Sequence, residues 1–263
     1  MRALPLLALL LCLGLLPIAH AGQTCEDKPL TPQAMHQALR LTQDLQATLD
    51  RQQARAAILG RVGSDVSRYG LRYTHAGIAY RSGLDQPWTV LHKLNNCGTD
   101  HAALYRQGLL NFFLDDPHEY RALALLPKPA LQERIVRAAE ADAGSSVDQP
   151  RYSLLAYPYT LDYQNSNGWA LEFLAVASAD VPLLGRAAAQ DYLRRSGYRA
   201  DRIEISAAER VGATLFKANV AFLDHPLGER LGGRYSVVTV ESIARYLGER
   251  QLITDTQELI ANR

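Results

Sequence analysis

Residues 73–94 constrain the fold most, because they read as two short strands joined by a turn, and each strand carries one histidine. If Tyr80 pairs with Pro87 across the connecting loop, the same antiparallel register places His75 directly opposite His92. Side chains opposite each other in such a pair share one face of the sheet, with Cβ atoms about 4.5–5.5 Å apart. We therefore expect the two imidazoles to interact. Small residues on the same face of the first strand leave room for something to approach.

Residues 1–21 have the pattern of a secretory signal peptide: one arginine, a long apolar run, and small residues before an expected cleavage site after Ala21. Cys12 lies too deep in the apolar run to be a lipid-attachment cysteine. We therefore expect an exported protein, periplasmic or secreted. The mature chain, residues 22–263, is long enough to bury one core, and no linker divides it.

The formal net charge is +1 at pH 7, and it falls to zero when the signal peptide takes Arg2 away. A neutral chain with mixed charges offers no electrostatic reason to expect nucleic acid or an anionic membrane as a partner. No apolar run of the mature sequence approaches the roughly 18–20 residues that span a bilayer. We therefore expect no integral membrane segment after the signal is removed.

Two cysteines remain in the mature sequence, Cys25 and Cys97. In an oxidising compartment such a pair usually forms a disulfide, which here would join the mature N-terminus to the loop after the second histidine strand. The alternative is that Cys97 is a free nucleophile near the two histidines, although an exported thiol tends to be oxidised.

Apolar periodicity and turn formers predict the remaining elements. A threonine cap followed by proline predicts a long helix that begins at Pro32. Residues 167–177 are almost wholly apolar, as in a central helix that is buried on most sides, and we expect Glu172 within it to have a partner such as an arginine or a backbone donor. Helices are also predicted over residues 100–110, 111–117, 129–143, 182–195 and 207–216, strands over residues 56–62, 120–127 and 201–206, and a strand followed by a helix over residues 235–247.

Ser166 or Asn165 would stand at the N-terminus of the central helix, where backbone N–H groups favour a developing oxyanion. A hydroxyl, a histidine within reach and a second polar group that orients the histidine are the parts of an acyl-transfer site. Ser166 would attack, His75 would take its proton, and His92 would fix the tautomer of His75. Taken singly, each also fits a structural role, because a serine at a helix start is often a cap.

Three short motifs carry a resemblance to a known family: Thr-His-Ala-Gly-Ile-Ala at 74–79, Val-Leu-His-Lys at 90–93 and Gln-Asn-Ser-Asn at 164–167. In kind and order they resemble the circularly permuted papain-like hydrolases, which include NlpC-type peptidases and lecithin retinol acyltransferase-like proteins. Through an Asn-Ser-Asn-x-Trp-x-Leu-Glu pattern the chain is also similar to a family of uncharacterised secreted bacterial proteins. The resemblance implies an α+β fold over residues 22–263, a single permuted papain-like domain in which a small antiparallel sheet packs on a central helix, with several additional helices.

Where that family has a nucleophilic cysteine, this chain has Ser166. A serine hydroxyl is not appreciably ionised at neutral pH, yet it works as a nucleophile when the base and the oxyanion donors are well placed. We therefore expect an exported hydrolase or acyltransferase that acts on an amide or ester, with a peptide, peptidoglycan or lipid-like substrate in the cell envelope and no cofactor. The residues expected to line the pocket are Tyr73, Gln164, Asn165 and Asn167.

Two alternatives remain open. One is a non-catalytic periplasmic binding module that keeps the pocket of a papain-like ancestor. The other is a metal site built from His75 and His92, although no Cys, Asp or Glu stands at convincing ligand spacing from them.

Overall fold

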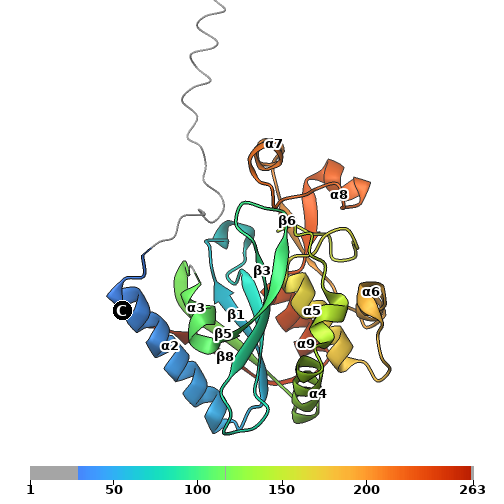
Figure 1. Cartoon of the computed structure of the whole chain (residues 1–263). Helices are drawn as coiled ribbons and strands as arrows, with labels where there is room; N and C mark the ends of the chain where they lie inside the picture. The colour runs from blue at the N-terminus through green and yellow to red at the C-terminus, as the bar shows by residue number, and fades with distance from the viewer. Residues whose placement is uncertain (1–28, 116, 262–263) are drawn as a thin grey trace, which may run out of the picture.

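The computed structural model describes residues 29–115 and 117–261, and its fold is α+β (Figure 1). Its centre is a six-stranded antiparallel sheet with the strand order β4-β3-β2-β1-β5-β8. The expectation of an antiparallel sheet with several helices is confirmed. The strands are β1 (Ala56–Val62), β2 (His75–Tyr80), β3 (Thr89–Asn95), β4 (Ala102–Gly108), β5 (Glu119–Pro127) and β8 (Ile253–Ile260).

Helices cover both faces of this sheet, as Figure 1 shows. Helices α2 and α3 pack on one face, over a core that includes Leu45 and Phe112. Helices α4, α5 and α9 cover the other face, around a core that includes Trp169 and Ile243, and α6 packs against α5. The bounds are α2 (Pro32–Arg51), α3 (Leu109–Leu114), α4 (Pro129–Glu140), α5 (Ser166–Ser178), α6 (Gly185–Arg195) and α9 (Val240–Glu249), with short 3₁₀ turns at Ser67–Tyr69 and Ala143–Val147.

Local sequence explains the two helices that were predicted most directly. The Thr31 hydroxyl accepts a hydrogen bond from the Ala34 N–H at 3.1 Å, and Pro32 occupies the first position of α2, as the cap signal predicts. Helix α5 buries nearly every side chain, in keeping with its apolar run. Because α5 is enclosed by the sheet and by neighbouring helices, its N-terminus is held at a fixed position.

A smaller two-stranded sheet lies beyond the main one and joins β6 (Asp201–Glu204) to β7 (Arg234–Val237). Helices α7 (Ala207–Phe216) and α8 (Leu227–Gly232) connect these strands and lie at the top of Figure 1. The strand at 201–206, the helix at 207–216 and the strand-to-helix run at 235–247 are thus confirmed in kind.

The predicted register of the histidine hairpin is wrong by two positions. Ile78 pairs with Leu91 and Tyr80 pairs with Thr89, so Tyr80 does not pair with Pro87. The connecting loop, residues 81–88, is therefore two residues longer than predicted, and within it the Arg81 guanidinium lies over the Trp88 ring at 4.6 Å, a contact that fits the observed register. An even slip leaves every side chain on its original face. His75 is therefore diagonal to His92 and not opposite it, but both still point to the same side of the sheet.

The helix predicted over residues 100–110 is also wrong, since Ala102–Gly108 form strand β4, which pairs with β3 along its whole length. The edge strand β8 was not predicted. The predicted signal peptide and Cys25 lie outside the described residues, so the pairing of Cys25 with Cys97 stays a prediction. Within the described ranges, no helix combines the length and apolar character needed to cross a bilayer.

Candidate functional site

Four side chains from four elements form one continuous chain of hydrogen bonds. The Ser166 Oγ at the start of α5 lies 3.1 Å from the His75 Nδ1 at the start of β2. The His75 Nε2 lies 2.9 Å from the His92 Nδ1 on β3. The His92 Nε2 in turn lies 3.1 Å from the Gln107 Oε1 on β4. The three residues that the sequence singles out for catalysis are therefore brought together, and Gln107 extends the chain.

The amide oxygen of Gln107 fixes the protons along this chain, because it only accepts hydrogen bonds. His92 must carry its proton on Nε2 to donate to Gln107, so its Nδ1 accepts the Nε2–H of His75. The Nδ1 of His75 is then left with a lone pair that accepts the hydroxyl proton of Ser166. His75 is thus held in the tautomer that a general base for Ser166 needs.

Phe112 of α3 fills the space beside the two imidazoles. Its ring centroid lies 5.7 Å from that of His75 and 5.2 Å from that of His92. A Cβ atom on Gly77 would come within 2.8 Å of Phe112 and 2.7 Å of Val90, so the close packing requires glycine there. The room that the small residues leave on this face is therefore occupied by the protein's own aromatic ring.

Burial keeps both histidines neutral at neutral pH. Burial lowers the pKa of His75 well below its ordinary value, and the positive charge of Arg61 and the neighbouring His92 act in the same direction. Burial, with Arg61, also lowers the pKa of His92 to about 4. Because a neutral imidazole is the form that accepts a proton, His75 is ready to act as a base across the physiological pH range.

The same burial predicts a loss of stability in mild acid. In the unfolded chain His92 titrates near 6.5, whereas in the folded protein its pKa is about 4, so only the unfolded state takes up the proton between these values. Its contribution to stability is complete above pH 6.5 and is lost as the pH falls toward 4. We expect the free energy of unfolding to drop by about 2 kcal/mol between pH 7 and pH 5 from His92 alone. Urea unfolding at both pH values measures this drop, and an equal drop in His92→Gln would contradict it.

The predicted pocket residues are mostly engaged in holding the protein together. Asn165 caps α5 by accepting the Gly168 N–H at 2.6 Å. Asn167 accepts the Ala76 N–H at 2.8 Å, which fastens the start of β2 to α5. Gln164 donates to Glu172 at 2.8 Å. Contact of these side chains with a substrate therefore stays a prediction.

Tyr73 is likewise buried at its ring and donates its hydroxyl to Glu258 of strand β8. The carboxylate of Glu241 accepts the backbone N–H groups of Arg72 and Tyr73 at 2.7 and 2.9 Å. These contacts fix the chain just before His75, so Tyr73 and Glu241 help to set the position of the base.

Two residues of the site were not predicted from the sequence. Gln107 was missed because its segment was interpreted as a helix, so the alternation of β4 was not followed. Tyr152 is buried before α5, where its hydroxyl is hydrogen-bonded with Ser166, and burial raises the Tyr152 pKa. Nothing distinguishes Tyr152 in sequence from the other tyrosines of residues 152–163.

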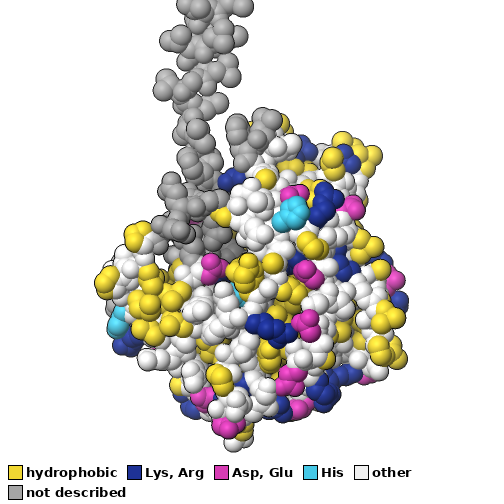
Figure 2. All heavy atoms as spheres, viewed as in Figure 1, with side chains coloured by type: hydrophobic (Ala, Val, Ile, Leu, Met, Phe, Trp, Pro, Cys, Tyr) yellow, Lys and Arg dark blue, Asp and Glu magenta, His cyan; other side chains and the backbone are white. Residues whose placement is uncertain are grey.

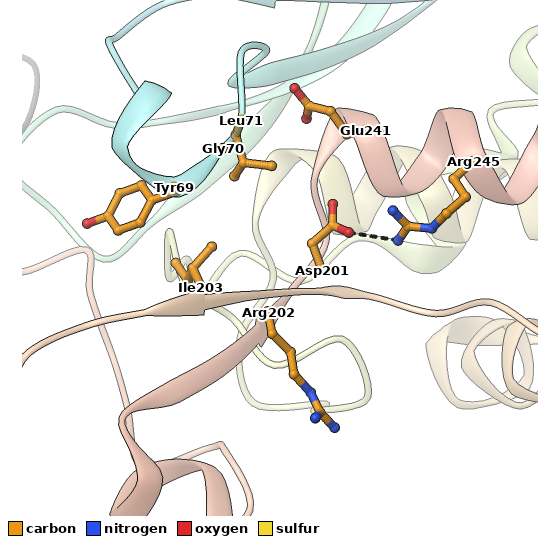
Figure 3. Close-up of a pocket in the computed structure, with 8 residues that line it drawn as sticks. All are labelled: Tyr69, Gly70, Leu71, Asp201, Arg202, Ile203, Glu241 and Arg245. Carbon is orange, nitrogen blue, oxygen red and sulfur yellow. Dashed lines mark ion pairs between the residues drawn. The ribbon is translucent and has the colours of Figure 1, made fainter.

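The site is covered in this conformation, since Ser166 is 5% exposed and His75 is 8% exposed. A cavity of about 240 Å³ lies near the loop that leads into β2, between Tyr69–Leu71, β6 and α9 (Figure 3). Figure 3 shows the ion pair of Asp201 with Arg245, at 2.8 Å, on one side of it. The three predicted catalytic residues do not line this cavity. A substrate therefore reaches Ser166 only if the covering residues move.

The histidine pair does not form a metal site in this arrangement. The facing nitrogens of His75 and His92 lie 2.9 Å apart, which leaves no room for an ion between them. Among the residues that the structure describes, no three Cys, His, Asp or Glu side chains converge as metal ligands.

Comparison with protein families relates the sequence to a group of bacterial proteins. Residues 48–247 match the family model described as an uncharacterized protein conserved in bacteria, DUF2145. The match includes Ser166, His75, His92 and Gln107. Comparisons with curated proteins and with solved structures gave no match. Because the family model spans well over half of the sequence, the chain belongs to the DUF2145 family of bacterial proteins.

Proposed function

We propose that this chain is an exported hydrolase or acyltransferase that attacks an amide or ester bond through Ser166. His75 is the general base, and His92 orients His75. The observation that carries the proposal is the chain of hydrogen bonds from the Ser166 Oγ through both imidazoles to the Gln107 Oε1. Because the Gln107 amide oxygen only accepts, each proton in this chain must point away from Ser166 and toward Gln107. This arrangement leaves the Nδ1 of His75 able to take the Ser166 proton.

The chemistry proceeds in two steps. As the Ser166 Oγ attacks a carbonyl carbon, its proton passes to the Nδ1 of His75, which then gives that proton to the leaving group as an acyl-enzyme forms. Water, or another acceptor hydroxyl or amine, then attacks the acyl-enzyme carbonyl while His75 takes its proton. His75 returns that proton to the Ser166 Oγ as the acyl group is released. His75 keeps its Nε2–H on His92 throughout, so the imidazole does not rotate while it is charged.

The start of α5 supplies groups for the negative charge on the carbonyl oxygen. The N–H groups of Ser166 and Asn167 belong to the first helical turn, whose N–H groups have no partner within the helix. They carry the positive end of the helix dipole. The Tyr152 hydroxyl, which is hydrogen-bonded with Ser166, is a further donor to the oxyanion.

The permuted papain-like (NlpC-type) fold is part of the same proposal. Two features support it: an antiparallel sheet packs on one buried helix, and the residues follow the order His75, His92 and Ser166, with the serine at the helix start. A peptide, peptidoglycan or lipid-like substrate in the cell envelope fits an exported enzyme of this class. The envelope location rests on the signal peptide pattern of residues 1–21.

A non-catalytic binding module is the second candidate. It is favoured by the 5% exposure of Ser166 and by the Tyr152 hydroxyl that covers it. In that case the hydrogen-bonded histidines would be structural parts of the core, and the serine would remain inaccessible to a reactive carbonyl.

Labelling of the mature protein with a fluorophosphonate probe distinguishes the two candidates. We expect covalent labelling of the wild type and complete loss of labelling in Ser166→Ala, because the probe reacts with an activated serine hydroxyl. Ser146→Ala is the matched control, since Ser146 is an exposed serine on a 3₁₀ turn. Intact-mass spectrometry measures the added phosphonyl group. Labelling that persists in Ser166→Ala would refute the nucleophile, and a wild type that stays unlabelled would favour the binding module.

A further inference from the structure

An open groove lies between α7, α8 and strand β7, in the small sheet region away from the Ser166 site. Its volume is about 510 Å³, within the range of roughly 300–1,000 Å³ that is typical of small-molecule sites. Phe222 and Tyr235 form its floor, with ring centroids 5.1 Å apart. Figure 2 shows apolar and basic side chains next to each other at the upper right, where Figure 1 places α8.

The rim of the groove exposes an unusual amount of apolar side chain. Leu223 is 78% exposed, Leu231 is 77%, Leu227 is 62% and Val211 is 60%. Single exposed leucines are common on protein surfaces, but four large apolar side chains around one concave surface mark an interaction site. Their arrangement along a groove suits a long, thin apolar ligand.

Two arginines line the same groove and have no carboxylate partner within the described chain. Arg210 donates to the Arg230 carbonyl at 2.6 Å and to the Tyr235 hydroxyl at 3.3 Å, and its Nε has no partner among the described residues. No ion pair of Arg230 is found among those residues either. No acidic residue lines the groove. The two guanidinium groups therefore form a positive region at one part of an apolar surface.

Two carboxylates on the helices that form the groove, Glu229 and Glu209, are engaged with other residues. Glu229 accepts from Ser236 and lies 3.0 Å from the Nδ1 of His225. Glu209 pairs with Arg68 at 2.8 Å. Because these contacts anchor α7 and α8, the walls of the groove are formed before any ligand binds, and the arginines remain available to an external anion.

We propose that this groove binds one acyl chain of an anionic amphiphile taken from solution, such as a long-chain fatty acid. The chain lies along Leu223, Leu227 and Leu231, and the anionic head group accepts hydrogen bonds from Arg210 and Arg230. Burial of the methylene groups supplies most of the affinity, and the two guanidinium groups select an anionic head. This binding site is independent of the chemistry proposed for Ser166.

Isothermal titration calorimetry of the mature protein with dodecanoate, below its micelle concentration and at pH 8, tests the proposal. We expect one bound dodecanoate and much weaker binding of dodecyltrimethylammonium, which has the same chain and the opposite charge. Arg230→Gln should weaken dodecanoate binding about tenfold, as for the loss of one hydrogen bond to a charged group. Leu227→Glu should abolish it by placing a carboxylate in the groove. Leu184→Glu is the control, because Leu184 is 87% exposed and lies at the start of α6.

Three outcomes would overturn the proposal. Equal binding of the two amphiphiles would remove the role of the arginines. Unchanged binding in both Arg230→Gln and Leu227→Glu would place the ligand elsewhere. Sedimentation of the protein with phosphatidylglycerol vesicles, together with no binding of dodecanoate, would make the groove a membrane-facing surface instead.

Discussion

Arg186→Ala is expected to lower the free energy of unfolding by about 3–5 kcal/mol, as for breaking a buried ion pair. Glu172 is 2% exposed within α5, and Arg186 donates to its two oxygens at 2.8 and 3.0 Å. The variant would leave this carboxylate without a cation, with only the neutral Gln190 and Gln164 as donors. Urea unfolding followed by circular dichroism measures the change.

The loss in this variant should depend on pH in a defined direction. Burial raises the pKa of Glu172 above its ordinary value of 4.5, and Arg186 opposes that rise, so the folded-state pKa increases further without Arg186. Below pH 4.5 Glu172 is protonated in both states and the penalty is small. As the pH rises, the unfolded state ionises first and stability is lost. We therefore expect the variant to approach the wild type in acid.

Arg134→Ala is the matched control, because Arg134 pairs with the exposed Asp180 at 2.8 Å. A surface pair contributes only about 0–1 kcal/mol. If the two arginine variants lost similar, small amounts of stability, the Glu172 carboxylate would not be the buried charge that this structure describes. Arg186 also donates to the Thr160 and Tyr163 carbonyls, so its loss should loosen the segment that leads into α5.

The parts of the fold that depend on local sequence were predictable. The cap at Thr31 and the apolar run of α5 were read correctly because each depends on residues close together in the chain. Glu172 was predicted to have a partner, either an arginine or a backbone donor, because a buried carboxylate needs compensation, and the structure shows an arginine. Its identity, Arg186, depends on how α6 packs against α5, which periodicity does not specify.

The errors in the sequence predictions come from contacts between distant segments. In the hairpin loop Arg81 packs on the Trp88 ring and donates to Asp50 of α2 at 2.7 Å, and the second contact joins segments that the hairpin sequence alone does not relate. The strand character of β4 follows from its pairing with β3 and not from its own residues, since the segment contains alanine, leucine and arginine, which also suit a helix. Gln107 was missed for the same reason.

The prediction that the two histidines share one face of the sheet is correct although the register was wrong, because successive side chains of a strand alternate between its two faces. A slip by one position would have placed His75 and His92 on opposite faces and removed the site. The contact of Ser166 with His75 joins residues 91 positions apart in the chain, and it was predicted from the kind and order of the motifs. What the sequence did not show is the burial of the site, in which Ser166 is 5% exposed and hydrogen-bonded with the buried Tyr152.

His75→Gln is expected to slow fluorophosphonate labelling of Ser166 by about 10²–10⁴-fold, the usual contribution of a general base. Glutamine keeps a polar side chain at this position but does not accept the Ser166 proton. In the wild type the labelling rate should stay level as the pH falls through 6.5 and decline only well below it, because burial and Arg61 lower the pKa of His75.

Gln107→Leu should slow labelling less than His75→Gln, since Gln107 acts only by fixing the tautomer of His92. Rates of labelling against pH, with His101→Gln as the exposed control, measure these differences. A wild-type rate that halves near pH 6.5 would show that His75 titrates as a solvated histidine, and an unchanged rate in His75→Gln would remove it as the base.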